Sequence, residues 1–197
     1  DEAIRILQES KILDKEYPGL IARYSEQLIS IYETQPDKEV YKKELLYYVF
    51  ECPQNNLVHI YKLKKVCTDK EWDGYREKIL KSPKNYNILY PFMEKEGMYE
   101  PMLECLKKET FIYNLDRYEK VLKEKFPEQV RDIYISYLPH EAERASNRNR
   151  YRELMKYLKK IRRYPRGKEK ASEIAKNWRA VYYRRTAMMD EMQKAGF

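Results

Sequence analysis

Residues 127–163 read PEQVRDIYISYLPHEAERASNRNRYRELMKYLKKIRR, and no other part of the chain shows its fold class more clearly. Apolar side chains recur there at the three- and four-residue spacing of an amphipathic helix, first at Val130, Ile133, Tyr134, Tyr137 and Leu138. The spacing resumes after a short polar break, at Leu154, Met155, Leu158 and Ile161. Ser146 lies in the break and can cap the second helix. The stretch therefore predicts two helices whose tight connection makes them antiparallel neighbours.

The same periodicity extends outward over almost the whole chain, and no segment keeps the period of two that a strand requires. The breaks have recognisable chemistry: Thr68 with Glu71 forms a capping box, and Ser82-Pro83 places Pro at a first helical position. We expect helices near residues 2–13, 18–34, 37–51, 55–67, 69–81, 84–96, 98–108, 111–125, 127–145, 147–163, 168–183 and 185–195.

Twelve short helices joined by tight turns predict an all-α fold. The expected architecture is an α-solenoid-like stack of antiparallel helix pairs, TPR- or HEAT-like with irregular repeats. We expect one helical-repeat domain over residues 1–197. The chain begins at Asp1, already in a helical pattern, so we expect it to be a fragment of a longer protein.

The charge is distributed unevenly. The chain carries 40 Lys+Arg and 32 Asp+Glu, a formal net charge of +8. Residues 1–140 hold 23 basic and 25 acidic residues, a net of −2, whereas residues 141–197 hold 17 and 7, a net of +10. A basic C-terminal part, 141–197, indicates an acidic partner, nucleic acid included. The alternative is a solvated helical surface that happens to use Arg and Lys.

The number of cysteines and the length of the apolar runs indicate the cellular compartment. Three cysteines, Cys52, Cys67 and Cys105, are too few and too widely spaced for a disulfide framework. No apolar run approaches the roughly 18 residues of a transmembrane helix. We therefore expect reduced thiols, a cytoplasmic location and no membrane contact.

No catalytic or metal-binding pattern is complete. The segment His140-Glu141-Ala142-Glu143-Arg144 begins like a zinc-protease helix, but Arg144 stands where the second His is needed. Cys52, His59 and Cys67 are seven and eight residues apart, unlike the short paired spacings of zinc sites. We expect no enzymatic activity, no cofactor and no small-molecule substrate.

The helix expected over 147–163 carries the main positive signal. Arg152, Lys156, Lys159 and Arg163 fall at i, i+4, i+7 and i+11, opposite the apolar stripe. Such a stripe could follow a phosphate backbone, unless acids of neighbouring helices pair with it. The candidate residues for binding an anionic partner are Arg144, Arg148, Arg152, Lys156, Lys159, Lys160, Arg163 and Arg166. Tyrosines interleave with them and could stack bases, but helix packing explains them better.

The C-terminal third resembles a known family. Residues 143–148 (ERASNR), 151–154 (YREL) and 183–192 (YRRTAMMDEM) are similar to the all-helical C-terminal region of bacterial SWIM zinc-finger proteins, as is the segment 72–80 (WDGYREKIL). The Cys-x-Cys and Cys-x-His ligands of that finger have no counterpart here. The resemblance implies a helical accessory region beside a finger that lies outside this chain.

Two functions follow as expectations. The first is a non-catalytic helical scaffold that binds a protein or peptide partner. The alternative is a nucleic-acid-binding module that uses the basic face around residues 144–170. Unpaired cations on that face would favour the nucleic-acid module, and cations paired with acids of neighbouring helices would favour the scaffold.

Overall fold

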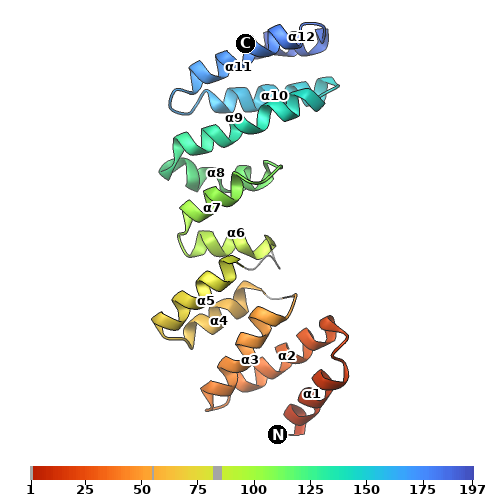
Figure 1. The fold of residues 1–197 in the computed structure, drawn as a ribbon, viewed down its shortest axis with the longest axis vertical. Coiled ribbons are helices and arrows are strands. Elements are labelled where there is room, and N and C mark those ends of the chain that lie inside the picture. Colours follow the sequence, from red (N-terminus) through yellow and green to blue (C-terminus); the bar gives the residue numbers. More distant parts are fainter. Residues whose placement is uncertain (1, 55, 82–85) are drawn as a thin grey trace. The chain divides into compact units, whose positions relative to one another are not determined.

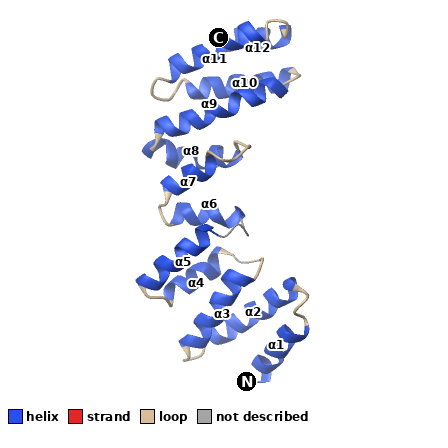
Figure 2. Ribbon diagram, viewed as in Figure 1, coloured by secondary structure: helices blue, strands red, loops and turns tan. Residues whose placement is uncertain are grey.

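The computed structural model describes residues 2–54, 56–81 and 86–197. These residues form twelve α-helices and no strand, which confirms the predicted all-α helical stack (Figures 1 and 2). The helices are α1 (Glu2–Leu13), α2 (Pro18–Glu33), α3 (Lys38–Glu51), α4 (Leu57–Lys65), α5 (Asp69–Lys81), α6 (Tyr86–Lys95), α7 (Tyr99–Leu106), α8 (Tyr113–Lys125), α9 (Pro127–Arg144), α10 (Arg148–Ile161), α11 (Gly167–Val181) and α12 (Thr186–Ala195).

The three predicted caps have three different outcomes. The amide of Thr68 donates to Glu71 Oε2 at 2.9 Å, and the amide of Glu71 donates to Thr68 Oγ1 at 3.4 Å, which is the predicted capping box. The prediction for Ser146 is wrong by one residue, because Asn147 Oδ1 accepts from the amide of Arg150 at 3.0 Å. The predicted cap at Ser82-Pro83 lies outside the described residues.

The chain divides into two compact units, residues 1–96 and 97–197. In the first unit α2 packs on both α1 and α3, and α3 packs on α4. Its core includes Leu28, Ile29, Leu45 and Leu63, all fully buried. The expectation of a single domain over residues 1–197 stays a prediction.

In the second unit α9 packs against α7, α8 and α10, while α10 also packs against α11 and α12. Its core includes Leu122, Leu138, Leu158 and Met192, all fully buried. Helix α10 therefore touches both helices that follow it, and its remaining surface is the one that carries the predicted basic stripe.

Candidate anionic-partner interface

The sequence of α10 separates an apolar face from a basic one. The five residues that it buries are Tyr151, Leu154, Met155, Leu158 and Ile161. Residues 148–163 contain eight cations and a single acid, Glu153. Since the buried residues all lie on one side of the helix, most of these cations lie toward solvent. Whether each cation is free to bind a partner depends on the acidic side chains next to it.

Arg148 and Arg152 are tied to α12. Arg148 Nη1 lies 2.9 Å from Glu191 Oε1 and also pairs with Asp190, and Arg152 Nε lies 3.2 Å from Glu191 Oε2. Glu191 is buried. Burial opposes ionisation of Glu191, but the bonds from Arg148 and Arg152 outweigh it and lower the pKa of its carboxyl. These two arginines hold α12 on α10 instead of standing free for a partner.

Lys160 is tied to α8. Its Nζ lies 2.7 Å from Asp116 Oδ1 and 2.9 Å from Glu119 Oε2. Burial acts to lower the pKa of the Lys160 ammonium, but the hydrogen bonds to the two carboxylates outweigh it and raise this pKa. Lys160 therefore belongs to the packing of the second unit and is removed from the predicted interface.

The tyrosines around α10 serve the same packing. Tyr134 Oη donates to Asp116 Oδ1 at 2.7 Å, and Tyr157 Oη donates to Asp116 Oδ2 at 2.9 Å. Tyr151 and Tyr164 are buried. Base stacking needs an aromatic face open to solvent, which neither of the two buried rings provides. The preference for a packing role of the tyrosines is therefore supported at these positions.

Of the eight predicted residues, three remain available: Lys156 and Lys159 on the exposed side of α10, and Arg163 in the turn that follows its last residue, Ile161. Lys156 pairs with Glu153 of its own helix at 2.6 Å, in a bond between two well-exposed side chains. Lys159 and Arg163 are exposed, and neither side chain makes a hydrogen bond, an ion pair or a ring contact within the described residues. We call Lys156, Lys159 and Arg163 the basic strip.

The last two predicted residues, Arg144 and Arg166, lie outside α10. Arg166 occupies the left-handed region, with φ of 55°, and pairs loosely with Glu169 at 3.6 Å. Arg144 is the last residue of α9 and is exposed, and its side chain has no partner among the described residues. The structure thus divides the eight predicted residues into three tied by acids of neighbouring helices, three in the basic strip, and two beyond it.

Sequence reasoning missed a hollow in the second unit. It has a volume of about 330 Å³ and lies between the connection of α7 to α8 and one side of α9. Its lining includes Phe111, Ile133, Ser136, Tyr137 and His140. Phe111, which lies two residues before the start of α8, is 77% exposed. We call this feature the α9 hollow.

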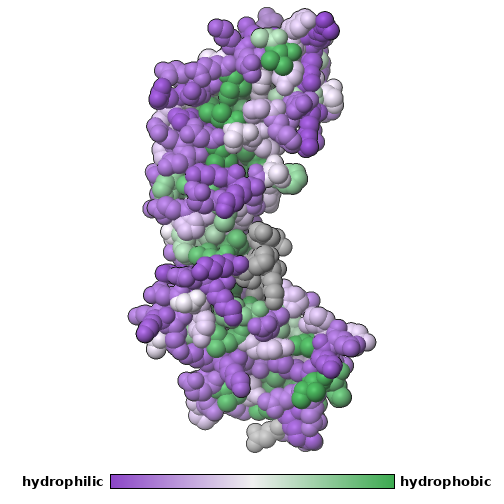
Figure 3. Space-filling view, viewed as in Figure 1, coloured by the Kyte–Doolittle hydropathy of each residue, from purple (hydrophilic) through white to green (hydrophobic). Residues whose placement is uncertain are grey.

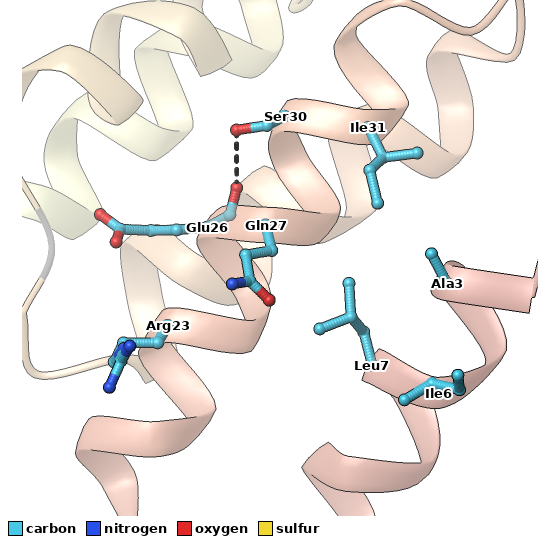
Figure 4. A pocket seen from close by; sticks show the side chains of 8 residues that line it. All are labelled: Ala3, Ile6, Leu7, Arg23, Glu26, Gln27, Ser30 and Ile31. Carbon is cyan, nitrogen blue, oxygen red and sulfur yellow. Dashed lines mark hydrogen bonds between the residues drawn. The ribbon is translucent and has the colours of Figure 1, made fainter.

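A second, more open groove lies in the first unit between α1 and α2 (Figure 4). Ala3, Ile6 and Leu7 point into it from α1, and Ile31 faces them from α2. Figure 3 shows hydrophobic atoms gathered at the α1 end of this unit. The hydroxyl of Ser30 at its edge donates to the carbonyl oxygen of Glu26, so this hydroxyl is already engaged.

The chemistry of the thiols and acids is consistent with packing roles. Cys52, Cys67 and Cys105 are free thiols, and burial raises the pKa of each.

No group of three or more His, Cys, Asp or Glu side chains able to hold a metal ion occurs among the described residues. Within the same residues, no helix combines the length and apolar content needed to cross a bilayer.

Comparisons of this chain with family models, with curated proteins and with solved structures gave no match. The resemblance to the SWIM zinc-finger proteins therefore stays a prediction.

Proposed function

We propose that this chain is a non-catalytic helical scaffold that binds an acidic segment of a partner protein on the basic strip of α10. One observation carries the proposal: carboxylates of α8 and α12 engage Arg148, Arg152 and Lys160. The exposed side chains of Lys159 and Arg163 have no partner within the described residues and leave a short strip beside Lys156. Free, exposed cations in a row attract a complementary run of carboxylates and steer its approach.

Two features favour a protein partner over nucleic acid. Arg148, Arg152 and Lys160 are already neutralised by carboxylates of α8 and α12. These pairs reduce the number of cations that α10 can offer to a phosphate backbone, whose affinity rests on the number of phosphates neutralised. The buried rings of Tyr151 and Tyr164 also give no platform for stacked bases.

The wider setting of the proposal comes from the sequence. The three free thiols fit a reducing, cytoplasmic location. The resemblance to the SWIM proteins supports an accessory role, in which this scaffold recruits a partner to a zinc finger outside the chain.

Fluorescence anisotropy tests the proposal with a labelled peptide of 12 glutamates at 50 mM salt. The double variant Lys159→Glu/Arg163→Glu should bind the peptide at least about tenfold more weakly than the wild type, because reversed charges repel the carboxylates. The matched control is Lys168→Glu/Lys176→Glu, which makes the same change of net charge on exposed residues of α11. It should bind within about twofold of the wild type.

Equal weakening by the two double variants would overturn the proposal, because the effect would then follow net charge instead of the strip. Labelled single- and double-stranded DNA and RNA oligonucleotides belong in the same experiment. If they bind more tightly than the peptide and lose roughly 10³-fold in affinity between 50 and 200 mM salt, the nucleic-acid module replaces the scaffold.

A further inference from the structure

A smaller hollow in the second unit, with a volume of about 120 Å³, lies between α9 and α10. A cavity needs only about 10–15 Å³ to hold one water molecule, so this hollow has room for a small organic group. We call it the interhelical hollow. Its lining comes from both helices and from the C-cap of α9, and consists of Tyr137, Glu141, Ala145, Arg150, Glu153, Leu154 and Tyr157.

Two tyrosine rings form adjoining walls of the interhelical hollow. The ring centroids of Tyr137 and Tyr157 lie 5.9 Å apart, and the ring planes meet at 73°. The hydroxyl of Tyr157 donates to Asp116, which fixes this ring in place. Leu154 and Ala145, both buried, add an apolar surface. Because the face of an aromatic ring carries negative partial charge, such walls attract a cation and also pack against its alkyl part.

The lining is acidic, although residues 141–197 are basic overall. Glu141 and Glu153 face a single cation, Arg150, across the interhelical hollow. The side chain of Glu141 is 22% exposed, yet Arg150 Nη1 and His140 Nδ1 each stay 3.9 Å from its carboxylate, beyond hydrogen-bonding distance. Burial, and then the charge of Glu141 and a hydrogen bond to it, raise the pKa of Tyr137 to about 12. Tyr137 is therefore a neutral donor, and Glu141 lacks a cation in direct contact.

We infer that the interhelical hollow binds an alkylammonium group, such as the side chain of a lysine. The alkyl chain packs against the tyrosine rings and Leu154, and the ammonium donates to the carboxylate of Glu141. A compact ammonium suits the small volume better than a planar guanidinium group does. Arg150 is well exposed, so its side chain does not close the hollow. The inference does not rest on the proposed function, because it concerns other residues and a ligand of the opposite charge.

Amide chemical-shift mapping tests the inference with two probes. One is n-butylammonium chloride, and the other is a capped Gly-Gly-Lys-Gly-Gly peptide whose only charge is the lysine ammonium. We expect saturable shifts at Tyr137, Glu141 and Tyr157 with n-butylammonium. The same shifts with the peptide would assign the hollow to a protein side chain, and their absence would assign it to a free amine.

Two controls separate the charge of the probe from its alkyl chain. 1-Butanol keeps the chain without the charge, and sodium chloride supplies a cation without the chain. Equal saturable shifts with either control, or no saturable shift with n-butylammonium, would overturn the inference.

Two substitutions should change the affinity in opposite directions. Glu141→Gln should weaken the binding of n-butylammonium by at least about tenfold, because the ammonium loses its counter-ion. Arg150→Gln should strengthen it by about threefold, because an exposed like charge is removed. The matched control is Glu143→Gln, which makes the same charge change as Glu141→Gln at an exposed residue of α9 outside the lining. It should leave the affinity within about twofold of the wild type.

The comparison of the two glutamates decides the location of the site. Equal weakening by Glu141→Gln and Glu143→Gln would show that the probe responds to net charge instead of the interhelical hollow, and would overturn the inference.

Discussion

Gly167, the first residue of α11, faces the backbone of the preceding helix. A Cβ at this position would lie 1.8 Å from the carbonyl oxygen of Ile161, so any larger side chain forces the backbone to move. We expect Gly167→Ala to lower the free energy of unfolding by at least about 2 kcal/mol, a typical cost of overpacking. Urea denaturation followed by the fluorescence of Trp178 measures this.

The control is Gly74→Ala in α5, read from the fluorescence of Trp72, which lies in the same unit. A Cβ there meets no atom within 4 Å, and the residue lies inside a helix. Alanine should raise the free energy of unfolding by about 0.5–1 kcal/mol, because it restricts the unfolded chain. Similar destabilisation by both substitutions would contradict the close approach described at Gly167.

Glu71 should make the stability of the first unit depend on pH in the acid range. The hydrogen bond from Lys42, and then those from Thr68, lower the pKa of its carboxyl from 4.5 to about 2. Because the pKa of Glu71 is lower in the folded state than in the unfolded chain, the ionised carboxyl stabilises the folded state at pH values above 4.5. This stabilisation is lost as the pH falls from 4.5 toward 2.

Glu71→Gln should therefore make the loss of stability between pH 4.5 and 2 less steep than in the wild type. Urea midpoints read from the fluorescence of Trp72, in a Trp178→Phe background, follow the first unit alone. Parallel acid dependences of the two proteins would show that the contact with Lys42 does not hold the pKa of Glu71 down.

At the scale of the elements, one arginine closes the end of α9. Arg185 Nη1 donates to the carbonyl oxygens of Ala142 and Ala145 at 2.7 and 3.1 Å, and Nη2 donates to that of Glu143 at 3.2 Å. These are carbonyls of the last turn, which have no partner within the helix, and a cation there also opposes the helix dipole.

Arg185→Ala should lower the free energy of unfolding by about 1.5–3 kcal/mol, the range for hydrogen bonds that involve a charged group. Arg184→Ala is the matched control. The neighbouring guanidinium is exposed and donates to Tyr183 Oη, so its loss should change the free energy by less than about 0.5 kcal/mol. Thermal or urea unfolding of the two variants distinguishes them, and equal effects would contradict the capping role.

The helices could be predicted from the sequence because their signals are local. Apolar periodicity and capping chemistry lie within a few residues of one another, and the capping box at Thr68 was found in this way. The error at Ser146 has the same origin, since Ser and Asn are equally good caps. Asn147 is the cap, and its backbone has the extended conformation of an N-cap residue, with φ of −141° and ψ of 164°.

The site could be predicted only in part because its contacts are not local. Glu191 lies about forty residues from the arginines that it pairs with, and the sequence does not say which helices are neighbours. The sequence predicts the basic stripe and leaves its pairing with acids of neighbouring helices open, but it does not say that Arg148, Arg152 and Lys160 are the paired residues. The α9 hollow needs the connection of α7 to α8 to lie beside α9, which again only the fold provides.

At the scale of the whole molecule, each compact unit holds one of the two tryptophans, and both rings are buried. Trp72 belongs to the first unit and Trp178 to the second. Because each unit has its own core, Gly167→Ala should lower the urea midpoint reported by Trp178 and leave that reported by Trp72 nearly unchanged. Single Trp→Phe backgrounds separate the two signals. Equal shifts of both midpoints would instead support the single cooperative domain expected from the sequence.

We propose that Lys156, Lys159 and Arg163 of the basic strip bind an acidic segment of a protein. Amide chemical-shift mapping with the 12-glutamate peptide is the most direct test, because each residue reports separately. We expect saturable shifts that are largest at these three residues. Shifts concentrated on α1 and α2, or an absence of saturable shifts anywhere in the chain, would contradict it.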